Sequence, residues 1–327
     1  MQRKTFHRTL LALAASALLP FAANADTTKL TLGHGAAPGN PRHEAALLFA
    51  ERVKAKTAGR IEVQVAHSAQ LGDDAAMVTA LRSGTLDMSA NSQGAMANVV
   101  PEYAALGLPF LFPDIQKAWQ LLDGPIGEDL AKRTAAKGMV VLGYWDNGIR
   151  HITNSKRPIK VPADVKGLKI RTPPDTMTVD IMQALGADTQ QIKFAELYVA
   201  LQQGVVDGQE NPLANVASAK LYEVQKYLSL TGHKYEATPF VISKRSWERL
   251  SPADQKVFTE AAAEATQLQR KLSKEADDKL AAELKSKGVQ VDAVDRKAFV
   301  EATRSVYTKW SAGPSGDFVK RVMQQVQ

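Results

Sequence analysis

The chain has 327 residues, 45% of them hydrophobic and 23% charged, and it has no cysteine. This composition is typical of a globular protein of one to three domains, and it excludes disulfide frameworks and zinc sites built from thiolates. The formal net charge is +7, which is compatible with binding to nucleic acids or anionic membranes. Whether the chain binds either of them depends on where the basic residues lie.

The first 25 residues have the pattern of a secretory signal. Three basic residues within Met1–Arg8 precede an apolar run, Leu10–Leu19, and Ala23-Asn24-Ala25 is a small-x-small cleavage site. A transmembrane anchor, the alternative, needs about 20 apolar residues, more than this run provides. Cleavage would remove three of the 41 basic residues and none of the 34 acidic ones, so the formal charge would fall from +7 to +4. We therefore expect an exported, periplasmic protein with residues 1–25 as its signal peptide.

Short apolar runs bounded by Gly, Pro, Asn or Asp alternate with helical patterns along the rest of the chain, which is typical of an α/β fold. The predicted strands are 29–33, 60–66, 86–90, 139–144, 168–171, 240–243 and 289–292. A first helix is expected after Asn40-Pro41, with Asn40 as its N-cap, and it is expected to stop at Gly59.

A long helix is expected to start at Ser251, where Ser251 and Asp254 can form a capping box. Apolar residues then recur at helical spacing without Gly or Pro until Gly288, so this helix could reach about 50 Å. Its apolar stripe is rich in alanine and drifts around the helix, which favours a brace between two lobes over a coiled-coil arm. We expect two α/β lobes with a ligand cleft between them.

Motifs for enzyme chemistry are missing from the sequence. It has no zincin motif, no Gly-x-Ser-x-Gly elbow, no P-loop and no Gly-x-Gly-x-x-Gly run, and its histidines lack metal-ligand spacing. A Ser-His-Asp arrangement assembled from distant segments remains open. The pattern favours a binding protein without a cofactor or metal over an enzyme.

Three segments between Tyr144 and Pro212 could together bind an anion. Arg150 follows a strand end and a Gly-containing turn, which would place it near the rim of a sheet, and Arg171 ends another strand before two prolines. Asn211 could cap a helix that Pro212 begins. The planar fork of arginine matches both oxygens of a carboxylate and stays charged when water is removed. Either arginine alone could equally be solvated or paired with a nearby acid.

Several runs of residues resemble the substrate-binding receptors of tripartite ATP-independent periplasmic (TRAP) transporters, the DctP-like family. The most specific run is Val206-Asp-Gly-Gln-Glu-Asn-Pro212 together with the arginines upstream of it. The other matching runs are Gln70–Asp74, Leu108–Phe112, Asn147–Arg150, Lys166–Arg171 and Phe194–Gln202. The resemblance covers essentially the whole chain after the signal, in order.

This resemblance implies a two-lobed periplasmic solute-binding protein fold, with hinge strands and a long bracing helix, that closes on a small organic acid. It implies that Arg171 makes the main salt bridge to the ligand carboxylate, that Arg150 and Asn211 assist, and that Phe194 packs nearby. The lobes would be residues 26–147 plus about 237–276 (lobe I) and 148–236 plus about 277–305 (lobe II). A C-terminal helix would follow at about 306–327.

Ligand selectivity is expected in lobe I, from His34, Asp74, Ser92 and Gln93, although such residues also serve as ordinary loop and cap residues. Sialic-acid receptors of the family carry acidic and basic contacts where this chain has Ser92 and Ala95, which argues against that ligand. A polar, largely uncharged wall suits hydroxyl groups. The favoured ligand is a hydroxylated sugar acid, a uronate or an aldonate; a C4-dicarboxylate or 2-oxo acid is the alternative.

The expected partners are the acid and the integral-membrane permease subunits of a TRAP transporter, and we expect a monomer. Nucleic acid is not expected, because the basic residues are interspersed with Asp and Glu along helices such as Lys271–Lys287. Two other classes remain as alternatives: an exported hydrolase or lyase that acts on the same acid, and an anion-dependent sensor that docks on a membrane receptor.

Overall fold

The computed structural model describes residues 27–326, so the predicted signal peptide lies outside the described residues. Nine strands form one sheet in the order β2-β1-β3-β8-β4-β7-β5-β6, and β9 pairs with β8. Their bounds are β1 Thr28–Gly33, β2 Ile61–Ala66, β3 Met88–Ala90, β4 Met139–Asn154, β5 Lys169–Thr172, β6 Asp188–Gln191, β7 Gly208–Pro212, β8 Tyr227–Ser243 and β9 Gln290–Asp292. Strands β1, β2 and β3 run parallel at one end of the sheet, and β5, β6 and β7 run parallel at the other.

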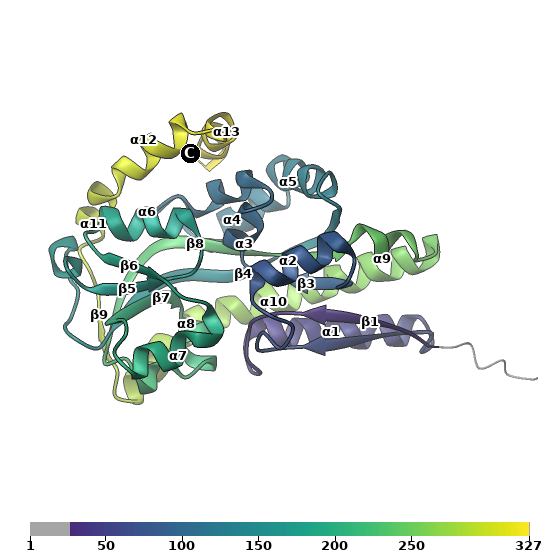
Figure 1. The fold of residues 1–327 in the computed structure, drawn as a ribbon, viewed down its shortest axis with the longest axis horizontal. Coiled ribbons are helices and arrows are strands. Elements are labelled where there is room, and N and C mark those ends of the chain that lie inside the picture. Colours follow the sequence, from purple (N-terminus) through teal and green to yellow (C-terminus); the bar gives the residue numbers. More distant parts are fainter. Residues whose placement is uncertain (1–26, 327) are drawn as a thin grey trace, which may run out of the picture.

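The two lobes share the long antiparallel pair β4 and β8, of 16 and 17 residues. One end of β8 pairs with β3 of lobe I, and its other end pairs with β9 of lobe II. The predicted strands 139–144 and 240–243 are therefore only the lobe I halves of strands that continue into lobe II. These strands are the expected hinge strands, and Figure 1 shows them passing between the lobes. The predicted lobe boundaries themselves stay a prediction.

The prediction of a turn before Arg150 is wrong, because β4 continues through this segment. Its register against β8 shifts between Asp146 and Gly148, and Gly148 has a φ of 118°. A β-bulge adds one residue to a strand, and glycine accepts the positive φ that such a bulge can need. Arg150 thus lies inside the sheet instead of at its rim.

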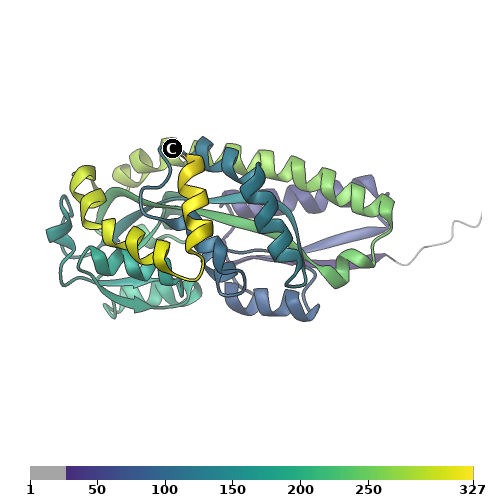
Figure 2. The same ribbon diagram turned by 90° about the horizontal axis from the view of Figure 1, so that it is seen from above.

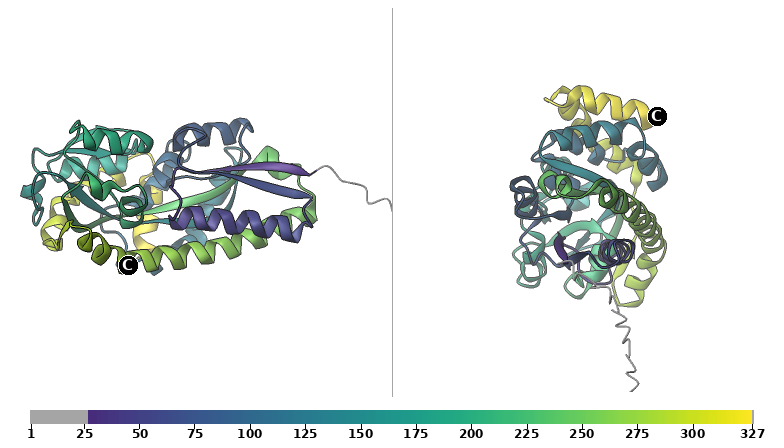
Figure 3. Two further views of the ribbon diagram at one scale, coloured as in Figure 1. Left: turned by 90° about the horizontal axis from the view of Figure 1, so that it is seen from below. Right: turned by 90° about the vertical axis from the view of Figure 1, so that its right-hand side faces the viewer.

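Helices cover both faces of each lobe (Figures 1 and 3). The helices of lobe I are α1 Pro41–Lys56, α2 Asp74–Ser83, α3 Gln93–Ala97, α4 Ile115–Leu122, α5 Pro125–Ala135 and α9 Lys244–Glu248, with a 3-10 turn, η1, at Pro101–Gly107. Those of lobe II are α6 Thr176–Ala184, α7 Phe194–Gln202, α8 Leu213–Ser218 and α11 Arg296–Ala302, with η2 at Pro162–Val165 and η3 at Leu221–Glu223. Within residues 27–326, no helix has both the length and the hydrophobicity needed to cross a membrane.

The long helix α10, Pro252–Ser286, has 35 residues and so measures about 52 Å. Ser251 is its N-cap, since the Asp254 backbone N–H donates to Ser251 Oγ at 3.1 Å. The predicted capping box is only half formed, because the Asp254 carboxylate accepts from the Ser251 hydroxyl and from Arg60. In lobe I, Phe258 packs against Phe49 of α1, with ring centroids 5.5 Å apart, and in lobe II Leu284 joins the core formed with α7 and α8. Figure 2 shows α10 along most of the length of the molecule, which confirms the bracing helix.

The C-terminal segment differs from the prediction of a single helix at about 306–327. It forms two helices, α12 Arg304–Ala312 and α13 Gly316–Val326, because Gly313 and Pro314 interrupt the pattern. Helix α12 packs on α6 of lobe II, and α13 packs on α4 and η1 of lobe I. Val306 and Phe318 belong to one continuous apolar core that spans both lobes on this face.

Candidate functional site

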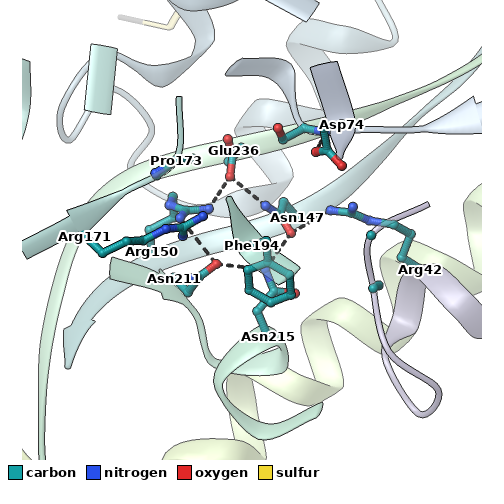
Figure 4. Close-up of a pocket in the computed structure, with 13 residues that line it drawn as sticks. Arg42, Asp74, Asn147, Arg150, Arg171, Pro173, Phe194, Asn211, Asn215 and Glu236 are labelled. Carbon is teal, nitrogen blue, oxygen red and sulfur yellow. Dashed lines mark hydrogen bonds and ion pairs between the residues drawn. The ribbon is translucent and has the colours of Figure 1, made fainter. Parts of the chain in front are cut away.

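A cavity lies between the lobes, beside the middle of β4 and β8 (Figure 4). Its lobe I wall consists of Gly35, Ala36, Arg42, Asp74 and Ser92. Its lobe II wall consists of Arg150, Arg171, Pro173, Phe194, Asn211 and Asn215. Asn147 and Glu236 line it from the hinge strands. Six of the eight residues predicted to bind ligand are therefore brought together here.

Arg171 is a buried cation whose terminal nitrogens are paired with no carboxylate of residues 27–326. It lies on β5, two residues before Pro173, and only 2% of its surface is exposed. Its Nε donates to the Ile192 carbonyl at 2.8 Å, and among residues 27–326 it forms no salt bridge. Burial lowers the pKa of Arg171 to about 10, so the group is still charged at neutral pH. The guanidinium carbon lies 5.9 Å from the Phe194 ring centroid, within the range of a cation–π interaction.

Arg150 is buried to the same extent, but it is neutralised by protein. Its Nη2 donates to the side chain and the backbone carbonyl of Glu210, both at 2.7 Å, and its Nη1 is paired with Glu236. Burial alone would lower the pKa of Arg150, but these two carboxylates raise it. Burial would likewise raise the pKa of Glu210, yet Arg150 lowers it to about 2. Arg150 therefore offers a ligand less free charge than Arg171 does.

Further buried charges stand behind Arg150. His233 Nε2 lies 3.2 Å from Glu210, and Lys234 is paired with Asp175 and donates to Thr178 at 2.6 Å. Burial would raise the pKa of Asp175, but Lys234 lowers it. A buried charge is tolerated when it is paired and hydrogen-bonded, so this network holds the lobe II wall in place.

Asn211 lies on β7 and does not cap a helix, so that prediction is wrong. Helix α8 begins at Leu213, and no side-chain hydrogen bond caps it. Asn211 Oδ1 instead accepts from Asn215 Nδ2 at 3.0 Å and from Arg150 Nη2 at 3.3 Å. An Asn-Pro pair can precede a helix whether the Asn caps that helix or ends a strand. Only the pairing of β7 with β4 shows that Asn211 belongs to a strand.

The lobe I wall contains a cation that the sequence reasoning missed, Arg42 in the first turn of α1. It is 5% exposed. Its Nη2 donates to Asn147 Oδ1 at 2.8 Å and to Thr238 Oγ1 at 3.0 Å, whereas its buried Nε has no partner. The expectation of a largely uncharged wall is therefore wrong, because Arg42 and Asp74 both line it. One signal could have indicated Arg42: a cation in the first turn opposes the helix dipole and so needs another reason to be there.

Gln93 and His34 do not line the cavity. Gln93 Oε1 accepts from the backbone N–H of Ala237 at 2.8 Å, which ties α3 to β8. His34 is fully buried and shares a hydrogen bond of 3.3 Å with His43. Burial lowers the pKa of His34 to about 3, so its ring is neutral. The structure places both residues behind the wall, where they support it.

The two lobes contact each other across the cleft. Lys193 Nζ on the lobe II side lies 2.7 Å from Asp73 of lobe I, and Asn40 Nδ2 donates to Asn215 and Ser218 at 3.0 and 3.2 Å. Clusters of His, Cys, Asp or Glu that could hold a metal are not found among residues 27–326. The arrangement can therefore enclose a small anion between two lobes that already touch.

The family is shown by comparison with known proteins. A sequence model of the bacterial extracellular solute-binding protein family 7, DctP, matches residues 32–312. The chain belongs to this family, which confirms the resemblance. The family is one of solute-binding proteins, and this protein is a solute-binding receptor.

Two relatives illustrate the similarity in sequence. The uncharacterized protein y4mM of Sinorhizobium fredii is 59% identical over 307 residues, which are 93% of this chain and 56% of that protein, so the chain spans little more than half of that relative. The 2,3-diketo-L-gulonate-binding periplasmic protein YiaO of Escherichia coli is 38% identical over 303 residues, 91% of this chain and 92% of YiaO.

Two solved structures illustrate the similarity in fold. A TRAP periplasmic solute-binding protein of Polaromonas sp. JS666 bound to D-erythronate has a TM-score of 0.87 and 38% identity, and covers 90% of this chain and 98% of its own. The sugar acid binding protein DctPAm of Advenella mimigardefordensis with galactonate has a TM-score of 0.89 and 33% identity, and covers 92% and 98%. These neighbours confirm the two-lobed α/β fold.

Proposed function

We propose that this receptor binds a small hydroxylated sugar acid, an aldonate or a uronate, between its lobes. The observation that carries the proposal is Arg171, a buried guanidinium that faces the cavity without a carboxylate partner among residues 27–326. The carboxylate of the acid would bind its terminal nitrogens bidentately. Asn211 and the Arg150 network would hold Arg171 and the ligand in place, and Phe194 would pack against the ligand.

The acidic groups of the cavity favour hydroxyls on the rest of the ligand. Asp74 and Glu236 line the cavity, and an ionised carboxylate can only accept hydrogen bonds. Glu236 Oε1 is buried without a hydrogen-bond partner among residues 27–326, and Lys234 Nζ lies 3.7 Å from it. Hydroxyl groups can donate to such oxygens, whereas a second carboxylate cannot. Arg42 would attract a second carboxylate, but Asp74 and Glu236 would repel it. The neighbours named for D-erythronate and galactonate bind aldonates, the favoured kind of ligand. The relative named for 2,3-diketo-L-gulonate binds a hydroxylated acid that is also a 2-oxo acid.

Binding would be coupled to closure of the lobes. An acid that contacts both walls stabilises the closed form by the difference between its affinities for the closed and the open form. The closed receptor would then deliver the acid, in the periplasm, to the integral-membrane permease subunits of a TRAP transporter. A monomeric receptor suffices for this mechanism, since both walls belong to one chain.

A thermal-shift screen tests the ligand class. The chain without residues 1–25 is mixed with D-erythronate, D-galactonate, D-galacturonate, D-glucuronate, succinate and pyruvate. A sugar acid at 100 times its Kd is expected to stabilise the folded form by about 2.7 kcal/mol and so to raise the melting midpoint by several degrees. A shift with succinate or pyruvate and with none of the four sugar acids would contradict the proposal.

A further inference from the structure

The lobe I wall presents a second cation that has no carboxylate partner in the part of the chain that the structure describes. Arg42 lines the cavity opposite Arg171 (Figure 4), and none of the salt bridges within 4.0 Å includes it. Its neighbours are neutral oxygens, those of Asn147 and Thr238 and, at 3.4 Å, the Ala90 carbonyl. Its buried Nε is unpaired. The hydrogen-bonding capacity of this guanidinium is thus incompletely used by protein.

The position of Arg42 does not serve the stability of α1. Helix α1 begins at Pro41, so Arg42 is its second residue, at the end where backbone N–H groups make the potential positive. Asn40 already caps this end through the Arg42 backbone N–H. A buried cation at this end is unfavourable unless something else stabilises it, and the remaining open direction is the cavity.

Asp74 supplies the complementary group on the same wall. Its Oδ2 accepts from the Ser92 backbone N–H at 2.9 Å, and no hydrogen bond to Oδ1 is found within residues 27–326. Burial lowers the pKa of Arg42, and the negative charge of Asp74 acts in the opposite direction. The wall therefore combines a group that only donates hydrogen bonds with one that only accepts them.

We infer that Arg42 and Asp74 determine specificity by binding the hydroxyls at the end of the ligand remote from its carboxylate. The inference rests on the proposed function and deepens it. A hydroxyl can accept from Arg42 and donate to Asp74, whereas a methylene can do neither. A second carboxylate could accept from Arg42 but would meet the charge of Asp74. A site built to hydrogen-bond a hydroxyl discriminates strongly against the analogue that lacks it.

The test measures a selectivity ratio by calorimetry, within each protein variant. D-Erythronate is paired with 2-hydroxybutanoate and D-galactonate with 2-hydroxyhexanoate. The two uronates, which are pyranoses in solution, are paired with tetrahydropyran-2-carboxylate. Each analogue keeps the carboxylate and the oxygen on the adjacent carbon but lacks the remote hydroxyls. The ratio is taken for the sugar acid that binds the unmodified protein most tightly. We expect Arg42→Met and Asp74→Asn each to lower this ratio at least about tenfold, and Arg42→Lys to lower it less.

Lys193→Met serves as the matched control, because it removes a cation that links the lobes beside the cavity. It should weaken both ligands equally and leave the ratio unchanged. If Arg42→Met does not fold, as judged by its circular dichroism and melting midpoint, Arg42→Lys and Asp74→Asn decide the question alone. Unchanged ratios in the folded variants would overturn the inference and leave the proposed function intact. If the unmodified protein binds none of the four sugar acids, both are overturned.

Discussion

Arg171 on the lobe II wall and Arg42 on the lobe I wall are both buried cations without a carboxylate partner among residues 27–326, yet their surroundings differ. Arg171 stands beside a network in which Arg150 pairs with both Glu210 and Glu236. Arg42 is held only by neutral oxygens. The lobe II wall is thus prearranged to bind one charged group. The lobe I wall instead offers the ligand several separate hydrogen bonds.

This difference suggests how one fold could serve several acids. Every ligand of the class carries a carboxylate, so a rigid carboxylate site can stay the same while the opposite wall changes. The lobe II wall is rigid because its buried charges are paired. The attraction within each pair offsets the cost of removing the charges from water only while the groups stay close together. On the lobe I wall, substitution of one side chain need not disturb its neighbours.

The largest effect on binding is expected from Arg171→Ala. Removal of a buried group that pairs with a ligand charge costs about 2–5 kcal/mol, so the Kd of the bound acid should rise at least thirtyfold by calorimetry. The melting midpoint of the ligand-free protein should stay the same or rise, because a desolvated cation without a partner is lost. Lys169→Ala, which removes an exposed charge from the same strand, is the control and should bind normally. An Arg171→Ala variant with unchanged affinity would contradict the assignment.

Arg150→Met should act on stability instead. It leaves Glu210 and Glu236 buried without their main partner, and breaking a buried ion pair in this way costs about 3–5 kcal/mol. The midpoint of urea unfolding should fall accordingly for the ligand-free protein. If Arg150→Met is as stable as the unmodified chain, the contrast between the paired arginine and the free one is wrong.

These two arginines also show which site residues can be predicted from the sequence. Arg171 and Arg150 could be predicted because they lie in short runs that resemble the DctP-like family, although the turn expected before Arg150 is absent. Arg42 was not found, because its role depends on the packing of α1 against β4 and β8, segments about 100 and 200 residues away. The sequence predicts that His34 and Gln93 contact the ligand, because their neighbours Gly35 and Ser92 line the cavity. Their own side chains point away from it, and a sequence does not show that direction.

The strands teach a similar lesson. Local patterns located most strands to within two residues, since apolar runs and bounding glycines are local signals. The length of β4 and β8 was missed, because Gly148 in β4 and Gly232 in β8 have a positive φ, which glycine permits in a turn and in a bulge alike. Only the partner strand decides between the two. Strand β6, Asp188–Gln191, was missed because it is polar and carries no apolar alternation.

A smaller effect, away from both walls, is expected at the hinge. Asp277 of α10 lies beside Gly148, and burial raises the pKa of Asp277 to about 7, from about 3.9 in the unfolded chain. Ionisation therefore penalises the folded form progressively from about pH 4 to pH 7. Asp277→Asn should stabilise the protein at pH 8 by about 1–2 kcal/mol, given its partial exposure, and hardly at all at pH 4.

Melting midpoints of the Asp277→Asn variant across this pH range check the prediction, with Asp278→Asn, one residue further along α10 and more exposed, as the control. A gain in stability that is equal at pH 4 and pH 8 would show that ionisation is not its cause. The selectivity ratio for ligands should not change, since neither wall contains Asp277.

The smallest effect is expected from Lys193→Met, which breaks the contact of Lys193 with Asp73 across the cleft. The lysine side chain is 58% exposed, and such surface pairs contribute about 0.2–1 kcal/mol. The affinity for every acid should fall by no more than about fivefold, and less at high salt. A loss of a hundredfold would mean that closure depends on this pair more than on the ligand.

The most direct measurement of the central claim is a crystal structure of the protein with the sugar acid that the thermal-shift screen identifies. The account predicts the carboxylate oxygens within about 3 Å of the terminal nitrogens of Arg171. It also predicts the remote hydroxyls against Arg42 and Asp74, with both lobes in contact with the ligand. A carboxylate bound by Arg42 and a polyol chain directed at Arg171 would contradict the account, as would a ligand bound by one lobe only.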